Sequence, residues 1–387
     1  IFFREMPSTS DLATAVRGPP RCVSAVKVGD IIWTEDATEG QLVKYITEFS
    51  GSLVELTLEN AAGVESKVTY NATLEVGCQE APTVAELLKN KDPNQITVSF
   101  EYFPPKTEKG VENLMNRIGL MRKADPIFCD VTWGAGGGTS DLTLELCTNA
   151  QIKWGVNANM HLTCTNMEKE KIDMALEGCK KVGIRNIVAL RGDPPVGQTE
   201  WKAIDTGFSC ALDLVKYIRE KHGDYFCLSI AGYPEGHPTV IADDGKCPPE
   251  AFAGEMAYLK EKVVAGGDLI ITQLFFDVDI FLSFCAECKK LGIEVPILPG
   301  IMIITSYGGF KKMAGFCKTW IPADLASKME EIKDDEAAVK EFGVQYAVDM
   351  CKKLIDAGHK HLHFYCLNVE GPTFAVMERL GLPVPGQ

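Results

Sequence analysis

Side chains that can do chemistry recur along this chain at the ends of short apolar runs. Glu101 follows Val-Ser-Phe, His161 and Gln273 close further apolar runs, Arg191-Gly-Asp193 comes directly after another, and Tyr365 stands near the C-terminus. A carboxyl group among apolar and aromatic neighbours has a raised pKa and can act as a general acid. We therefore predict that Glu101 is such an acid, with a carboxylate paired to a nearby cation as the alternative.

Two segments could bind a phosphorylated ligand. Gly134–Gly138 is rich in glycine, and the backbone N–H groups of such a loop can cradle a phosphate, although glycine-rich loops are common. Arg191 suits a phosphate, and Asp193 suits the polar edge of a ring. Arg191-Gly-Asp193 also matches an adhesion tripeptide, but Ile187–Leu190 directly before it is typical of a buried strand, which disfavours that interpretation.

Two other patterns could indicate metal or redox sites but lack support. Cys285 and Cys288 form a single CxxC on a predicted helix with no second pair nearby, which argues against zinc or redox chemistry. His359, His361 and His363 alternate along one predicted strand, so their side chains share one face. No carboxylate cluster accompanies them, and we therefore assign no metal ligands.

The elements that must position these residues alternate between strand and helix from about residue 96 onward. The predicted strands are Thr97–Glu101, Ile127–Thr132, Asn157–Leu162, Asn186–Leu190, Phe226–Ala231, Leu269–Leu274, Pro296–Ile301 and His361–Leu367. The predicted helices include Gly110–Lys123, Met167–Val182, Cys210–Lys221, Glu250–Ala265 and Ala337–Ala357. This alternation predicts an α/β fold, a (β/α)8 TIM barrel, whose active sites form where strands end. A doubly wound open sheet is the alternative, disfavoured because no glycine fingerprint follows the first strand.

The first 82 residues have a different character. Residues 1–20 contain Pro, Ser, Thr and Gly without a period and are expected to form an arm. Residues 21–82 hold short β-branched runs separated by Gly and Asn, among them Leu53–Leu58 and Lys67–Tyr70, which predict a small antiparallel β module of unknown role. Residues 83–387 are then the barrel domain.

Composition excludes several classes of protein. The net charge is −14, and no run is rich in Lys or Arg, which argues against binding nucleic acid. The longest apolar runs, such as residues 295–304, are far shorter than the roughly 20 residues of a membrane-spanning helix. A chain of this length can bury its own core, so we expect the 14 cysteines to be reduced thiols.

The strand ends, taken in order, resemble the methylenetetrahydrofolate reductase family, and most closely its plant-like eukaryotic branch. The match covers about residues 95–383. The segments that carry it are Ser99-Phe-Glu-Tyr-Phe-Pro-Pro-Lys106, Val131-Thr-Trp-Gly-Ala-Gly136, His161-Leu-Thr-Cys-Thr165, Ala189-Leu-Arg-Gly-Asp-Pro-Pro195, Ala231-Gly-Tyr-Pro-Glu-Gly-His-Pro238, Ile271-Thr-Gln-Leu-Phe-Phe-Asp277 and His363-Phe-Tyr-Cys-Leu-Asn368.

The resemblance implies a flavoprotein oxidoreductase of folate and one-carbon metabolism. FAD lies across the top of the barrel in this family, NADH or NADPH reduces it, and 5,10-methylenetetrahydrofolate then takes the hydride to give 5-methyltetrahydrofolate. Glu101 would be the acid that helps to open the methylene bridge, and Asp193 would hold the pterin and tune the flavin. Gln273 and Tyr365 would contact folate. The residues that would contact FAD are Thr132, Trp133, His161, Arg191, Gly192, Asp193, Cys210, Ala211, Tyr233, His237, Glu255 and Lys262.

Three positions depart from the family pattern. Ile304 stands where a second Pro usually follows the seventh strand, Val369 where many members have Arg, and Glu255 where Asp is usual. These departures bear on folate affinity more than on FAD binding. The regulatory domain that follows the barrel in eukaryotic members has no counterpart here, so we expect no inhibition by S-adenosylmethionine.

A second interpretation keeps the fold but changes the role. The additional β module and the departures near the folate site are compatible with a barrel that serves as a subunit of a larger assembly with little or no folate activity. We expect a homo-oligomer, or assembly through residues 1–80. A cytoplasmic location is expected, with the mitochondrial matrix as the alternative because the chain begins at Ile1.

Overall fold

The structure is a computed structural model. It describes residues 31–32, 41–50, 53–59, 65–71, 81–133, 140–165, 167–192, 206–242 and 245–385. Among these residues, no helix combines the length and apolar character needed to cross a bilayer. The twelve cysteines of this part that can be assessed are all free thiols, as expected.

Four strands before residue 72 form a separate antiparallel sheet. They are β1 (Ile31–Ile32), β2 (Gln41–Ser50), β3 (Leu53–Glu59) and β4 (Glu65–Asn71), paired in that order. The two predicted strands at residues 53–58 and 67–70 are confirmed, whereas β2 was not predicted. The role of this sheet stays a prediction.

The second sheet closes into the predicted barrel. Its strands are β5 (Thr97–Tyr102), β6 (Phe128–Val131), β7 (Ala158–Thr163), β8 (Asn186–Leu190), β9 (Cys227–Gly232), β10 (Leu269–Thr272), β11 (Ile297–Leu298), β12 (Gly300–Met302) and β13 (His361–Tyr365). Neighbours along the chain pair in parallel from β5 to β11, and β13 pairs with β5. The barrel fold is therefore confirmed.

The seventh barrel strand is interrupted at Pro299. β11 pairs with β10 on one side, and β12 pairs with β13 on the other. Proline has no N–H to donate to a ladder, so it divides the strand, while its carbonyl accepts from His363 N at 3.2 Å. Gly300 follows because a Cβ there would lie 2.3 Å from the Thr272 carbonyl oxygen.

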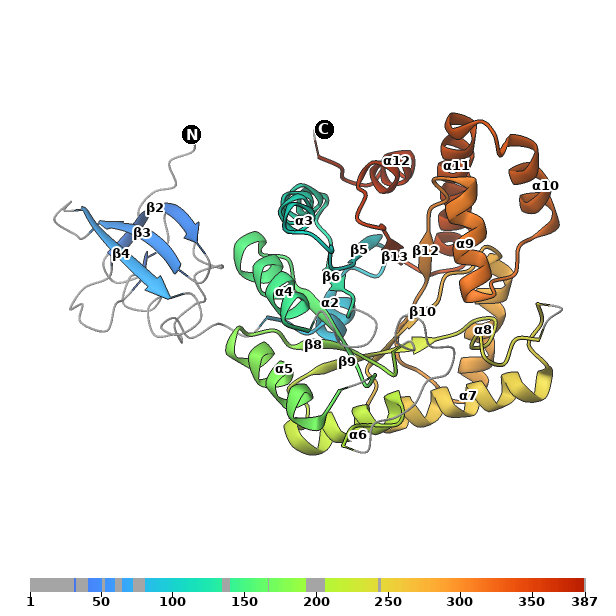
Figure 1. The fold of residues 1–387 in the computed structure, drawn as a ribbon, viewed down its shortest axis with the longest axis horizontal. Coiled ribbons are helices and arrows are strands. Elements are labelled where there is room, and N and C mark those ends of the chain that lie inside the picture. Colours follow the sequence, from blue (N-terminus) through green and yellow to red (C-terminus); the bar gives the residue numbers. More distant parts are fainter. Residues whose placement is uncertain are drawn as a thin grey trace.

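Helices surround the barrel strands (Figure 1). They are α2 (Val84–Asn90), α3 (Glu108–Met121), α4 (Ser140–Trp154), α5 (Lys169–Lys181), α6 (Ala211–His222), α7 (Pro249–Val264), α8 (Val278–Lys290), α9 (Tyr307–Cys317), α10 (Ala323–Ile332), α11 (Glu336–Asp356) and α12 (Gly371–Arg379). The helices named from sequence are confirmed within two residues at each end. Helices α9 and α10 are an addition between β12 and α11.

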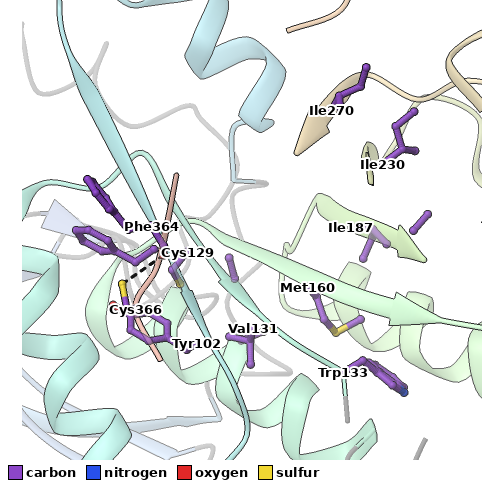
Figure 2. Close-up of a cluster of buried hydrophobic side chains, with 14 of the residues drawn as sticks. Tyr102, Cys129, Val131, Trp133, Met160, Ile187, Ile230, Ile270, Phe364 and Cys366 are labelled. Atoms are coloured by element: carbon purple, nitrogen blue, oxygen red, sulfur yellow. Dashed lines mark hydrogen bonds between the residues drawn. The ribbon is translucent and has the colours of Figure 1, made fainter. Parts of the chain in front are cut away.

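Strand residues alternate between the helical layer and the barrel interior. Figure 2 shows Tyr102, Cys129, Met160, Ile187 and Phe364 among the buried apolar side chains that pack toward the helices. The intervening positions carry polar groups into the interior. Those of β5 are Thr97, Ser99 and Glu101, and those of β13 are His361, His363 and Tyr365. The same alternation that builds the core therefore delivers polar side chains to one line inside the barrel.

Helix α2 closes the floor of the barrel, the end where the strands begin. A capping box joins Thr83 and Glu86 at its start. Val84 is fully buried among Phe128, Val188 and Leu269, and its N–H donates to Asn186 Oδ1 at 2.7 Å. The part of the floor under α2 is consequently apolar and packed, and the mouth at the other end is left for ligands.

Candidate active site

Two adjoining cavities open at the ends of the barrel strands. The mouth cavity has a volume of about 1350 Å³, and the side cavity, toward α6 and α7, about 880 Å³. Leu190, Arg191, Ala231, Tyr233 and His237 line both, so the two form one continuous trough.

The predicted site residues that the structure describes all line this trough. Those of the mouth cavity are Glu101, Thr132, Trp133, His161, Arg191, Gly192, Tyr233, His237, Gln273 and Tyr365. Those found only in the side cavity are Cys210, Ala211, Glu255 and Lys262. Asp193 and Gly134–Gly138 lie outside the described residues. Placement is thus as expected, whereas the roles stay predictions.

Glu101 lies at the end of β5 among other ionisable side chains. Its Oε2 is 3.5 Å from His161 Nε2, and the side chain is 21 % exposed. Burial raises the pKa of Glu101 to about 7, with His161 opposing the shift and Asp130 adding to it. A carboxyl group of this pKa is protonated in a large share of molecules near neutral pH, as a general acid must be.

Asp130 on β6 is a site residue that sequence reasoning missed. It is fully buried, and its Oδ2 is 3.4 Å from His161 Nε2 and 3.6 Å from His363 Nε2. Burial lowers the pKa of His161, but the hydrogen bond to Asp130 and the charges of Glu101 and Asp130 outweigh burial and raise it overall. The signal was a carboxylate inside the apolar run Phe128–Val131, comparable with Glu101 in β5.

Oxygen or nitrogen atoms of Glu101, Asp130 and His363 all lie within 4.8 Å of one another. Such a spacing suits a cation or a group that shares protons. His363 Nδ1 lies 2.7 Å from the Ser99 hydroxyl oxygen, a proton-exchanging partner, and this favours proton sharing.

Cationic side chains line the side cavity despite the acidic chain. Lys262 is 4 % exposed, and its Nζ donates to the Ala231 carbonyl at 2.8 Å. Burial lowers the pKa of Lys262 to about 8, with Glu255 opposing. Burial, Arg191 and Lys262 lower the pKa of His237 to about 4. A lysine and an arginine side chain in one cavity suit a phosphate-bearing ligand.

Gly192, which follows Arg191, leaves room at the junction of β7 and β8. Its φ is +87°, a conformation that favours glycine. A Cβ there would lie 2.6 Å from Thr165 Oγ1 and 2.9 Å from Thr163 Cβ. The backbone therefore runs close to the trough, where N–H groups can meet a ligand.

Gln273 and Tyr365 reach the mouth cavity from β10 and β13. The Gln273 Oε1 accepts from Leu274 N at 2.8 Å, which directs its amide along the cavity wall. The Tyr365 hydroxyl donates to the Thr272 carbonyl, so the side chain reaches from β13 to the end of β10. Its ring, next to the ring of His363, remains a wall of the cavity.

Apolar side chains form a rim that the sequence did not indicate. Met313 and Phe316 from α9, Met302 from β12 and Leu367 after β13 line the mouth cavity. Phe316 is 66 % exposed and Leu367 is 40 % exposed. An apolar rim above the polar base of the mouth cavity suits a flat, partly aromatic ligand.

Two of the three positions that depart from the family pattern lie away from the polar base of the mouth cavity. Ile304 is buried with α9, α10 and α11 in a second apolar cluster. Val369 is 45 % exposed. The residues on either side of it bind the guanidinium of Arg117 from α3, which pairs with Glu370 and donates to the Asn368 carbonyl.

The two patterns that could indicate metal or redox sites, the CxxC pair and the three alternating histidines, have structural explanations. Burial raises the pKa of both Cys285 and Cys288 to about 12, which keeps them protonated. His359 precedes β13 and meets Phe281 edge-on with ring centroids 4.8 Å apart. Only His361 and His363 of the three share the barrel interior.

Comparisons with known proteins agree on one family. A family model described as methylenetetrahydrofolate reductase matches residues 86–381. Methylenetetrahydrofolate reductase (NADH) 1 of Arabidopsis thaliana is 54% identical over 74% of this chain and 49% of its own length. The 5,10-methylenetetrahydrofolate reductase of Escherichia coli is 35% identical over 74% of this chain and 92% of its own length. The chain thus spans about half the length of the plant relative.

A solved structure supports the fold alone. It is an uncharacterized protein from Clostridium thermocellum, described as binding two copies of 5-methyl-5,6,7,8-tetrahydrofolic acid. It covers 76% of this chain and 98% of its own length at a TM-score of 0.52 and 15% identity.

Proposed function

The chain belongs to the methylenetetrahydrofolate reductase family, and from this membership we propose that its barrel reduces 5,10-methylenetetrahydrofolate to 5-methyltetrahydrofolate, using NADH and a bound FAD. The observation that carries the proposal is Glu101, an acid with a pKa of about 7 at the base of the mouth cavity. NADH is favoured over NADPH because relatives at 54% identity bear the NADH name, whereas the NADPH name belongs to a relative at 35%.

Opening the methylene bridge requires a proton on the nitrogen that leaves the bridge carbon. Glu101 would supply it, because its carboxyl group lies at the cavity surface and is held partly protonated at neutral pH. The cation left on the folate would then be stabilised by the carboxylate that remains. His161, 3.5 Å away, orients the Glu101 carboxyl group.

The trough fits FAD by the chemistry of its donors. Lys262 and Arg191 would hold the diphosphate in the side cavity, and the backbone at Gly192, which lines the mouth cavity, would lie beside the ligand. When bound, FAD supplies hydride transfer between the nicotinamide and the folate. The apolar rim with Phe316 and Leu367 would shield the stacked rings from water.

The test separates the two half-reactions under anaerobic conditions. Purified protein should carry flavin, NADH should reduce it in a stopped-flow spectrometer, and methylenetetrahydrofolate should then reoxidise it with formation of 5-methyltetrahydrofolate. A protein that binds FAD and oxidises NADH but leaves methylenetetrahydrofolate unchanged would refute the substrate and favour the role as a subunit of an assembly.

A further inference from the structure

A line of buried polar side chains runs inside the barrel from its floor toward Glu101. Its first part consists of Thr97 and Ser99 on β5 with His361 and His363 on β13, which the strand register places side by side. These four side chains are between 0 and 8 % exposed. Polar groups this deep in a core are costly unless hydrogen-bonded, so their partners decide what they do.

Both histidines contact hydroxyl groups of β5 along this line. Thr97 Oγ1 lies 2.9 Å from His361 Nδ1, and Ser99 Oγ lies 2.8 Å from His361 Nε2. The same Ser99 oxygen lies 2.7 Å from His363 Nδ1. The His361 imidazole therefore bridges the hydroxyl groups of Thr97 and Ser99, and Ser99 joins it to His363 Nδ1. The ring of Phe128 stacks on both imidazoles at centroid distances of 5.6 and 5.8 Å and fixes their planes.

The second part joins His363 to the acid. His363 Nε2 is 3.6 Å from Asp130 Oδ2, the same oxygen is 3.4 Å from His161 Nε2, and His161 Nε2 is 3.5 Å from Glu101. Asp130 Oδ1 and His363 Nε2 are buried without a hydrogen-bond partner among the described atoms. One bridging water molecule would satisfy both and shorten the step between them.

The floor end meets a side chain that reaches water. Lys91, directly after α2, places its Nζ 3.4 Å from Thr97 Oγ1 and 3.2 Å from the Lys360 carbonyl oxygen. Lys91 is only partly buried. The line therefore connects solvent at the barrel floor with Glu101 at the mouth, through residues on the adjacent strands β13, β5, β6 and β7.

We propose that this interior line (Thr97, His361, Ser99, His363, Asp130 and His161) returns a proton to Glu101 after each turnover, from solvent at the barrel floor. The inference rests on the proposed function, which consumes one proton for each folate reduced. Folate and flavin would fill the mouth, so water reaches Glu101 more readily from below than from above.

The proton balance is simple. Glu101 gives its proton to the nitrogen that leaves the methylene bridge and becomes a carboxylate. It regains a proton from His161, which is resupplied in turn by Asp130, His363, Ser99, His361 and Thr97, and one proton enters from water near Lys91. No electron moves along the line, and rotation of the hydroxyl groups and rings restores the starting arrangement.

The charges along the line favour this use. Burial lowers the pKa of His363 to about 4, with Asp130 opposing and His161 adding to the effect. Burial, His363 and Lys91 lower the pKa of His361 well below its ordinary value. Both imidazoles are thus neutral at pH 7, and a neutral imidazole can accept on one nitrogen and donate from the other. Glu101 faces His161, Asp130 and Tyr365.

Thr97→Val tests the proposal at the point farthest from the substrate. It replaces the hydroxyl with a methyl group of similar size and breaks the contact with His361. Thr97→Ser keeps the hydroxyl, and Ser229→Ala is a matched control because Ser229 is a buried interior serine bonded to Asn159, outside the line. Flavin content and melting temperature confirm that each variant folds.

The measurement compares one turnover with many. Reduced enzyme mixed once with methylenetetrahydrofolate should react at the wild-type rate in every variant, because Glu101 already holds its proton. Steady-state kcat of Thr97→Val should fall about tenfold at unchanged KM, less than the 10²–10⁴-fold loss expected on removing the acid itself. Proton uptake, followed with a pH indicator, should lag behind flavin oxidation, and the solvent deuterium effect on kcat should grow.

The outcomes are distinguishable. Wild-type kcat and uptake in Thr97→Val would overturn the interior line, and so would an equal loss in the single turnover, which would indicate distortion of Glu101. A loss in Ser229→Ala as large as in Thr97→Val would also overturn it. Wild-type protein that never reduces methylenetetrahydrofolate would instead refute the proposed function, before any variant is compared.

Discussion

Replacing Glu101 with glutamine removes the proposed acid while keeping the size and the hydrogen-bonding capacity of the side chain. Because the role proposed for Glu101 is in the reaction with folate, the variant should bind FAD and be reduced by NADH at nearly the wild-type rate. The subsequent reaction with methylenetetrahydrofolate should fall by 10²–10⁴-fold, the usual contribution of a general acid.

The magnitude follows from the surroundings of the carboxyl group. With the ordinary pKa of 4.5, roughly 0.3 % of molecules would hold the proton at pH 7, whereas a pKa of about 7 leaves about half protonated. Burial thus increases the population of active acid about 150-fold at pH 7. The wild-type folate step should be flat below pH 7 and fall about tenfold for each pH unit well above it.

The raised pKa of Glu101 also makes the stability of the folded protein decrease as the pH rises. The folded protein holds the Glu101 proton more tightly than the unfolded chain, so stability declines as the pH rises from about 4.5 through 7. The full difference corresponds to about 3 kcal/mol above pH 7, and the 21 % exposure of the side chain reduces it. Glu101→Gln should therefore unfold at a higher temperature than wild type at pH 8 and gain nothing at pH 4.

The assay is anaerobic stopped-flow, with flavin absorbance followed first against NADH and then against methylenetetrahydrofolate, from about pH 6 to 9. Thermal unfolding of the same samples, with FAD saturating, gives the stability comparison. Equal losses in both half-reactions would refute the role of Glu101 as the folate acid, and so would a wild-type folate step that does not change through pH 7.

Three further substitutions test other parts of the structure. Gly192→Ala should raise the FAD dissociation constant at least tenfold in a flavin fluorescence titration, because the new methyl group would press on Thr163. Lys262→Met should weaken FAD binding. In wild type, the affinity for FAD should fall as the pH rises through about 8, where Lys262 loses its charge, and this fall should be absent from the variant. Unchanged binding in the same titration would count against the side cavity as the phosphate site. Gly343→Ala should lower the melting temperature although alanine favours helices, since its Cβ would collide with the carbonyl of Ile304; a stabilised variant would show that α11 can shift freely.

The sequence predicts the barrel well because its strands obey a simple rule. Apolar positions face the helices at every second residue, and the polar positions between them, such as Glu101 and His161, appear wherever a strand nears the mouth. Such a pattern depends only on local alternation. The same reasoning located residues of the mouth cavity, because active sites of this fold gather at strand ends. Cys210, Ala211, Glu255 and Lys262 of the side cavity came instead from the family resemblance.

Features that depend on contacts across the barrel were not predictable. Nothing local to Pro299 says that the strand around it is shared between two neighbours, and Asp130 reads as an isolated acid until β7 brings His161 beside it. The helix predicted from Met167 starts two residues later in the structure, as α5. It begins at Lys169 with no side-chain cap, because Thr165 donates instead to the Arg191 carbonyl.

The pairing of β5 with β13 also governs when the protein can become active during its own synthesis. Strands β5 to β10 lie next to their neighbours in chain order, so a growing polypeptide can assemble them one after another on the ribosome. The two open edges of that incomplete sheet can join only after residues 361–365 have emerged, 264 positions after Thr97. Until then, each edge exposes unpaired backbone groups to other chains, a period in which a chaperone would find its target. The histidines of β13 meet the hydroxyl groups of β5 in the same closing event, and an unfinished chain therefore carries its acid without the groups that we propose to recharge it.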